Sequence, residues 1–247
     1  MNPAIRLLLL SKTPTIPPDI GNLVGWWDAA SIAGLANDDP CGTWSDRSGL
    51  GNHVTQAGAA SLKPTYKTGV QNSLPGVYFD GGDYLFNHAI AAYFSGDDKP
   101  LSVVLALKIT NGASPYPLMC GNAATNALFG CGYNSDIIKC AKVDDSAATK
   151  VAEAAYTYNN TAHIAAYKHT TVASAWASGA AKFVDQAADA GATTLDTFCL
   201  GAGLIPTMSV NITGHLFSVL LYRSALSDAD RVLIQNYQSA KWGIALS

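Results

Sequence analysis

The chain has 247 residues, of which 49% are hydrophobic and 13% charged, and its formal net charge is −3 at pH 7. This composition excludes an intrinsically disordered chain, and the length is sufficient for one domain with a sizeable core. The weak negative charge attracts phosphate groups poorly. Nucleic acid and membrane surfaces are therefore not expected partners.

Residues 1–20 are expected to form an N-terminal arm that ends in a proline-rich spacer. The apolar run 7–10 is four residues long, whereas a signal-peptide core needs about seven or more and a membrane span about 20. We expect the arm to attach the domain to a partner protein; the alternative is that the run folds back onto its own domain. The expected attachment residues are Ile5, Leu7, Leu8, Leu9, Leu10 and Ile16.

From residue 21 onward the pattern predicts β-structure. A first strand is expected at 23–29, where Trp26 and Trp27 must point to opposite faces. One indole is therefore expected to enter the core directly, while the arm or a neighbouring loop covers the other.

Two turn-rich segments follow this strand. In 44–56 (WSDRSGLGNHVTQ), the serines, the aspartate and the glycines favour a compact, hydrogen-bonded loop. In 75–86 (PGVYFDGGDYLF), a short strand is expected to enter a tight hairpin turn at 80–83 and to leave through 84–86.

These segments carry a family resemblance. The runs LVGWWDAASI, WSDRSGLGNHVTQ and PGVYFDGGDYL, with the Pro64-Thr65-Tyr66 step between the last two, resemble the laminin-G-like, concanavalin A-like jelly-roll family. The C-terminal run GHLFSVLLYRSALSDADRVLIQNYQSAKWGI resembles the closing strand and helix of bacterial and phage members. The resemblance covers residues 22–245 and implies an all-β sandwich of two antiparallel sheets, spanning 21–247, with a C-terminal α-helix. Because this fold hosts lectins, glycosidases and structural modules, it does not decide the function.

The middle of the chain supplies the remaining strands. Leu101–Ile109 is an apolar run of strand length and fits a central strand. The segment 147–155 is expected to be a loop or a short edge strand. Further strands are expected at 117–121, 127–131, 137–143, 161–169, 172–178, 180–184, 197–203 and 214–222.

One helix is predicted near the C-terminus. Ser227 fits its N-cap, Asp228 and Asp230 its first turn, and Gly243 its end. Apolar residues recur at helical spacing and are expected to form the buried stripe, with Trp242 closing the contact. That stripe comprises Leu226, Ala229, Leu233, Tyr237 and Ala240.

The five cysteines contain no C-x-x-C pair, so the sequence specifies neither a disulfide framework nor a zinc site. They are expected to be reduced thiols packed as small hydrophobic side chains. A Cys131–Cys140 or a Cys120–Cys131 bridge remains open as an alternative. The full set is Cys41, Cys120, Cys131, Cys140 and Cys199.

The acidic residues argue against an enzyme. A glycosidase places two carboxyl groups across the scissile bond, and the hydrolases that share this sandwich resemble one another in a Glu-rich strand motif. This chain has a single glutamate, Glu153, and its paired aspartates sit beside turn-forming residues. His163 and His169 share a strand face but lie about 20 Å apart, too far to hold one metal ion. We therefore expect no catalytic activity.

Calcium is the one cofactor that the resemblance suggests, because many laminin-G-like and pentraxin-like relatives hold this ion. Asp46, Asp80 and Asp83 could supply oxygen ligands. The alternative is that Asp80 and Asp83 only build their turn and that Asp46 pairs with Arg47 or with backbone amides.

Two functions fit these observations. The first is a structural or attachment component of a larger assembly: a phage virion protein of the head, tail or fibre, bound to copies of itself or to capsid or tail proteins. A virion protein needs no export signal; outside a virion we expect cytoplasmic location or non-classical release. The alternative is a carbohydrate-binding module that recognises cell-surface glycans through aromatic and amide side chains. The candidates are Tyr116, Tyr133, Asn134, Tyr156, Tyr158 and Asn159.

Overall fold

The computed structural model describes residues 17–97, 99–110, 115–122, 124–134, 137–170, 173–178, 183–186, 191–204, 208–209 and 211–246. The predicted attachment residues Ile5, Leu7, Leu8, Leu9, Leu10 and Ile16 lie outside these ranges. Attachment through the arm therefore stays a prediction.

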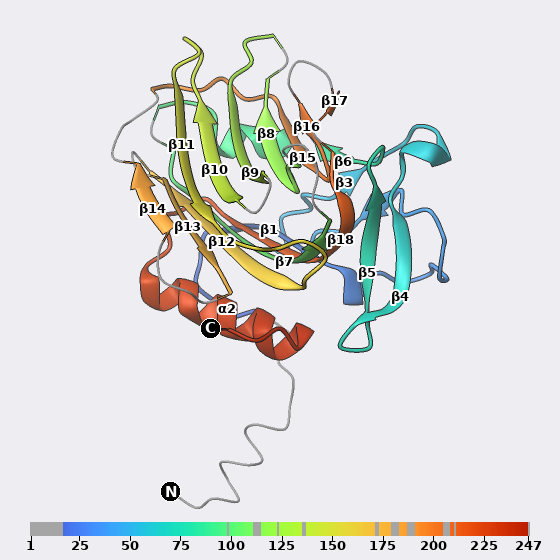
Figure 1. The fold of residues 1–247 in the computed structure, drawn as a ribbon. Helices are drawn as coiled ribbons and strands as arrows, with labels where there is room; N and C mark the ends of the chain where they lie inside the picture. The colour runs from blue at the N-terminus through green and yellow to red at the C-terminus, as the bar shows by residue number, and fades with distance from the viewer. Residues whose placement is uncertain are drawn as a thin grey trace, which may run out of the picture.

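Within the described ranges the chain forms two eight-stranded antiparallel sheets packed face to face, with helix α2 on the outside of the first sheet (Figure 1). This confirms the predicted all-β sandwich with a C-terminal helix. No helix in these ranges is long and apolar enough to cross a membrane.

The first sheet has β7 and β18 at its centre. β5 pairs with the N-terminal part of β18, and β1 pairs with the C-terminal part on the same side. The strands, in sheet order, are β14 (Phe183–Gln186), β13 (Ala173–Ala177), β12 (His163–His169), β7 (Leu101–Ile109), β18 (Thr213–Tyr222), β5 (Leu74–Asp80) and β4 (Thr65–Gln71); outside this order, β1 (Leu23–Asp28) pairs with β18.

The second sheet includes the segment 147–155, which forms the edge strand β11. The strands, in sheet order, are β11 (Thr149–Ala155), β10 (Ile137–Val143), β9 (Leu128–Tyr133), β8 (Leu118–Gly121), β15 (Thr197–Leu200), β6 (Leu85–Asn87), β3 (Val54–Thr55) and β2 (Thr43–Trp44). The remaining elements are a ribbon of β16 (Gly203–Leu204) and β17 (Met208–Ser209) and three short 3₁₀ helices, η1 (Ala29–Ser31), η2 (Ala60–Leu62) and η3 (Ala89–Tyr93).

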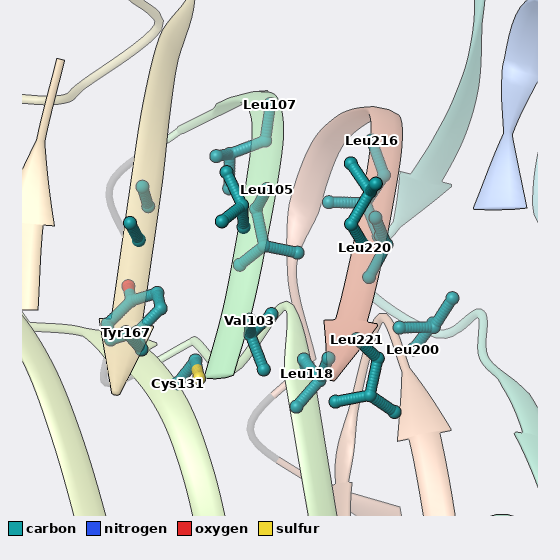
Figure 2. Close-up of a cluster of buried hydrophobic side chains, with 14 of the residues drawn as sticks. Val103, Leu105, Leu107, Leu118, Cys131, Tyr167, Leu200, Leu216, Leu220 and Leu221 are labelled. Atoms are coloured by element: carbon teal, nitrogen blue, oxygen red, sulfur yellow. The ribbon is translucent and has the colours of Figure 1, made fainter. Parts of the chain in front are cut away.

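The core lies between the two sheets. Figure 2 shows Val103 of β7 near Leu221 of β18, with Leu118 of β8 and Leu200 of β15 from the opposite sheet. These side chains are almost completely buried, and full burial of a leucine contributes roughly 1.5–3 kcal/mol. β7 reads as a continuous apolar run because the second sheet covers one of its faces and α2 covers the other.

The loop 44–56 is hydrogen-bonded, as the sequence predicted, and the Asp46 carboxylate accepts four of these hydrogen bonds. Oδ1 of Asp46 accepts hydrogen bonds from the amides of Trp26 (2.9 Å) and Ser48 (2.8 Å). Oδ2 accepts from the Ser48 hydroxyl (2.7 Å) and from the Asn52 amide (2.9 Å). The loop is therefore fastened to β1 from within.

Both tryptophans of β1 are buried. Trp27 faces the core, where its ring stacks on Phe198 with the centroids 5.3 Å apart. Trp26 points to the opposite face, and the Arg47 guanidinium lies over its ring at 5.1 Å. The loop thus covers the second indole, which was one of the two predicted alternatives.

The hairpin expected at 80–83 is wrong. β5 belongs to the first sheet and β6 to the second, so this turn carries the chain from one sheet to the other. β5 pairs with the preceding strand β4 and with the distant strand β18, and β6 pairs with β3 and with the distant strand β15. The sequence of the turn at 80–83 carries no information on these partners.

Helix α2 (Asp228–Trp242) begins and ends where predicted: Ser227 Oγ accepts from the Asp230 amide (3.1 Å), and Gly243 has a left-handed φ of 62°. The predicted buried stripe is wrong in part, because Ala229, Leu233 and Ala240 are exposed. The buried face consists of Ile234, Gln235, Tyr237, Gln238, Lys241 and Trp242.

Polar groups on the sheet explain this rotation of the helix. Gln238 donates to the Ser218 hydroxyl (3.1 Å), and Lys241 forms a buried ion pair with Asp28. Trp242 stacks on Phe217 with a centroid distance of 5.4 Å, as its predicted closing role requires. An apolar stripe could not reveal polar partners on another element.

Candidate functional site

Three of the candidate glycan-binding tyrosines do meet in the fold. Tyr133 and Tyr158 have ring centroids 4.4 Å apart, and the Tyr156 ring lies 5.5 Å from the ring of His163 in β12. The Tyr133 hydroxyl is 2.7 Å from Nε2 of His163. These three tyrosines, which the sequence suggested as parts of one site, therefore lie close together around His163.

This cluster is core and not an exposed platform, because Tyr133, Tyr158 and His163 are completely buried. Burial lowers the pKa of His163 to about 4, so the imidazole is neutral at pH 7. Its Nδ1 lies 2.9 Å from the Thr161 carbonyl, which can only accept; Nδ1 therefore carries the proton, and Nε2 accepts from Tyr133. Tyr133 and Tyr158 are therefore core residues, and their buried rings are not available to a glycan.

The other candidates do not join one site. Asn134 and Asn159 are exposed, while Tyr156 is half-buried and its hydroxyl lies 3.1 Å from Ser178 Oγ. Tyr116 belongs to a separate apolar cluster with Met119 and Leu128.

The position of Tyr116 explains two glycines of β9. A Cβ added at Gly130 or Gly132 would approach the Tyr116 ring to 2.6 or 2.8 Å. The ring is 7% exposed, and Lys139 Nζ lies 4.8 Å from its centroid. Tyr116 is therefore packed against the sheet and offers little surface to a sugar.

The three candidate calcium ligands are engaged in local hydrogen bonds. Asp46 binds the four donors described above, Asp83 accepts from the Asp80 amide (2.9 Å), and Asp80 accepts from the Gly82 amide (2.8 Å). Burial raises the pKa of Asp83 to about 6. Among the described residues no three His, Cys, Asp or Glu side chains come together to hold a metal ion. Calcium binding stays a prediction that these contacts do not support.

A hollow of about 790 Å³ opens beside β2 and β3, at the edge of the second sheet. Its lining combines aliphatic side chains, hydroxyls, one amide and one ammonium group. The lining residues are Ser31, Ile32, Ala33, Leu35, Gly42, Thr43, Ser45, Thr55, Gln56, Ala57 and Lys63.

Local hydrogen bonds position two sides of the hollow. Asp28 caps η1 by accepting from the Ala30 amide (3.0 Å), and Ser31 Oγ donates to the Asp28 carbonyl (2.7 Å). This fixes where the segment 31–35 leaves β1. On the other side, Thr43 and Thr55 are directly opposite in the β2–β3 ladder, so their side chains share one face.

Gln56 is the best-buried polar side chain in this lining, at 5% exposure. Its Oε1 accepts from the Gly58 amide (2.9 Å), while its Nε2 has no hydrogen-bond partner among the described residues. A buried donor of this kind calls for an acceptor beside it. Lys63 is half-buried, and among the described residues no acidic side chain lines the hollow. The hydroxyls and the Lys63 ammonium group therefore offer donors, beside an aliphatic wall, to a ligand rich in oxygen.

Sequence reasoning missed this hollow. Its lining comes from short pieces between residues 31 and 63, and none of these pieces carries a motif. The one available signal was the excess of small hydroxyl residues in 43–55 without a core role.

The sequence matches no known protein-family profile and no curated protein. Solved structures do resemble the fold. The CBM40 domain of the Ruminococcus gnavus IT-sialidase, bound to α2,3-sialyllactose, aligns with a TM-score of 0.55 at 15% identity, over 66% of this chain and 95% of that one. The binding domain of Paraclostridial Mosquitocidal Protein 1 aligns with a TM-score of 0.59 at 10% identity, over 90% of this chain and 55% of that one. The NanB sialidase of Streptococcus pneumoniae gives 0.54 and 13%, over 63% and 27%.

At such identities the likeness shows the fold alone. The chain is a β-sandwich of the architecture that carbohydrate-binding modules also use. Membership of the laminin-G-like family, which the sequence suggested, is not confirmed by a family match.

Proposed function

We propose that this chain is a non-catalytic carbohydrate-binding domain and that the hollow beside β2 and β3 holds the sugar. The observation that carries the proposal is the lining: an aliphatic wall of Ile32 and Leu35, several hydroxyls, and the half-buried ammonium group of Lys63. A sugar ring presents apolar C–H faces and a rim of hydroxyls, which such a lining complements. The fold likeness to glycan-binding modules supports the same function.

Binding without cleavage fits the acidic residues. Hydrolysis by the usual carboxyl pair needs two groups across the bond, and the lining contributed by the described part of the chain contains no acidic side chain. Glu153 lies elsewhere, exposed on β11 and directly opposite Lys139 of β10.

Of the described residues that line the hollow, Lys63 is the one with a charged side chain. A hydrogen bond to a charged group contributes about 1.5–3 kcal/mol. We therefore infer that a sugar bearing a carboxylate binds more tightly than its neutral counterpart.

The test is a titration of the full chain with 3′-sialyllactose and with lactose, followed by isothermal calorimetry and by NMR chemical-shift mapping. We expect shift changes at 31–35 and around Thr43, Thr55 and Gln56. The substitution Lys63→Met should weaken sialyllactose binding roughly 10- to 100-fold. The matched control is Lys67→Met, whose ammonium pairs with Asp38 outside the hollow; it should bind as the unsubstituted chain does. A glycan array with no hit, or shift changes confined to another surface, would refute the proposal.

The attachment role in a phage virion, which the sequence favoured over glycan binding, finds no support in the comparisons. The arm through which it would act lies outside the described residues. Of the two functions, glycan recognition is the better supported.

A further inference from the structure

None of the five cysteines forms a disulfide in the structure, and all five are buried. Two of them nevertheless face each other: Cys131 of β9 is directly opposite Cys140 of β10. Cys120 is opposite Phe129 in the neighbouring ladder, so the alternative Cys120–Cys131 bridge has no direct pairing. The structure therefore separates two pairings that the sequence left open.

Backbone hydrogen bonds define the type of the Cys131–Cys140 pair. Asn134 and Ile137 exchange both of their backbone hydrogen bonds, each 2.8 Å long. Antiparallel pairs alternate between hydrogen-bonded and non-hydrogen-bonded types. Counting three pairs back along the ladder, Cys131–Cys140 is a non-hydrogen-bonded pair. The Tyr133 amide agrees with this count, because it points away from β10 and donates to the Pro115 carbonyl (2.9 Å).

This pair type suits a cross-strand disulfide. Opposed Cα atoms lie about 4.5 Å apart at a non-hydrogen-bonded pair, with the side chains close together. Disulfides span Cα separations of about 4.4–6.8 Å. The Cα separation expected for this pair type therefore falls within the disulfide range, at its short end.

The pair lies on the core side of the second sheet. Both residues are 0% exposed, and Figure 2 shows Cys131 projecting from β9 toward Tyr167 of β12. Burial and the neighbouring Cys140 thiol raise the pKa of Cys131 well above its ordinary value. Since the thiolate is the reacting species, exchange in the closed sandwich must be slow and exchange before the sheets pack must be fast.

We propose that Cys131 and Cys140 close a cross-strand disulfide when the chain folds in an oxidising environment, so that the β9–β10 hairpin carries a redox-dependent staple. One thiolate attacks glutathione disulfide and releases one glutathione thiolate. The second cysteine thiolate then attacks the mixed disulfide and releases another. The two cysteines thus lose two protons and two electrons, and glutathione disulfide takes up the electrons. This inference is independent of glycan binding.

The first experiment uses the full chain with Cys41, Cys120 and Cys199 replaced by alanine, refolded in a glutathione redox buffer. We expect no titratable thiol under denaturing conditions, and a crosslink between the peptides that contain Cys131 and Cys140. The melting temperature should exceed that of the reduced protein by roughly 5–10 °C. Adding Cys140→Ala should leave one titratable thiol and remove this redox response.

The three alanine substitutions could prevent folding, so the second experiment uses the unsubstituted chain. It is refolded in the same buffer, alkylated and mapped by mass spectrometry. A Cys131–Cys140 crosslink supports the staple. Full alkylation of both cysteines in the folded product, or a crosslink between a different pair, overturns it.

Discussion

Replacing Asp46 by alanine tests whether one buried carboxylate organises the loop 44–56. This side chain is 9% exposed and accepts four hydrogen bonds, from the amides of Trp26, Ser48 and Asn52 and from the Ser48 hydroxyl. Two of those donors belong to buried residues, Trp26 and Asn52. The substitution leaves both amides without an acceptor while the loop still has to cover Trp26.

The expected cost follows from those two amides. Each buried donor left unsatisfied costs about 1–3 kcal/mol, and Ser48, which is half-buried, can turn to water. The free energy of unfolding should therefore fall by roughly 3–5 kcal/mol. For a domain of this size that corresponds to a melting temperature lower by about 10 °C.

The assay is urea unfolding followed by tryptophan fluorescence, with Asp38→Asn as the control. Asp38 has a side chain that is 61% exposed and pairs with Lys67 at the surface, and asparagine tolerates the left-handed φ of 73° at this position, so loss of the charge should cost less than about 1 kcal/mol. A loss below 1 kcal/mol for Asp46→Ala would refute the reasoning. Repeating both curves with calcium and with a chelator tests the metal hypothesis, because a stabilisation by calcium that disappears in Asp46→Ala would make Asp46 a ligand.

Two further predictions concern buried ionisable side chains. The pKa of His163 is lowered to about 4 in the fold, whereas an exposed histidine titrates near 6.5. Between these pH values the unfolded chain therefore binds one proton more than the folded chain. The free energy of unfolding should be at its full value above pH 6.5 and should fall by roughly 3 kcal/mol toward pH 4. Unfolding curves at several pH values should show a smaller loss for His163→Gln, and equal losses in both proteins would contradict this cause. Lys241→Met leaves Asp28 buried without its cation and should lower the free energy of unfolding by about 3–5 kcal/mol in the same assay. Lys67→Met breaks a surface pair and should lower it by less than about 1 kcal/mol. Similar losses for the two variants would mean that burial does not determine how much an ion pair contributes to stability.

The features that the sequence predicted correctly are those decided by neighbours along the chain. β7 was predicted at its observed bounds because an apolar run of strand length fits few other structures. The ends of α2 follow from Ser227 and Gly243, which act within one turn of the helix. The same local reasoning misplaced the buried face of α2. Gln238 and Lys241 are on this face because they bind Ser218 and Asp28, which lie 20 and 213 residues away in sequence.

The candidate ligand site shows the same limit from the other direction. Several tyrosines close together in sequence are a reasonable signal for a sugar-binding surface. In the structure, however, the rings of Tyr133 and Tyr158 pack against each other and against His163 inside the sandwich. The hollow at the sheet edge, by contrast, is lined by several short segments between residues 31 and 63. Such segments are too short to show a periodic sequence pattern. Structural neighbours at 10–15% identity share the sandwich without fixing what lines such an edge. The chemistry of Gln56 and Lys63 therefore has to be judged in this chain itself, and the Lys63→Met titration is the measurement on which glycan recognition depends.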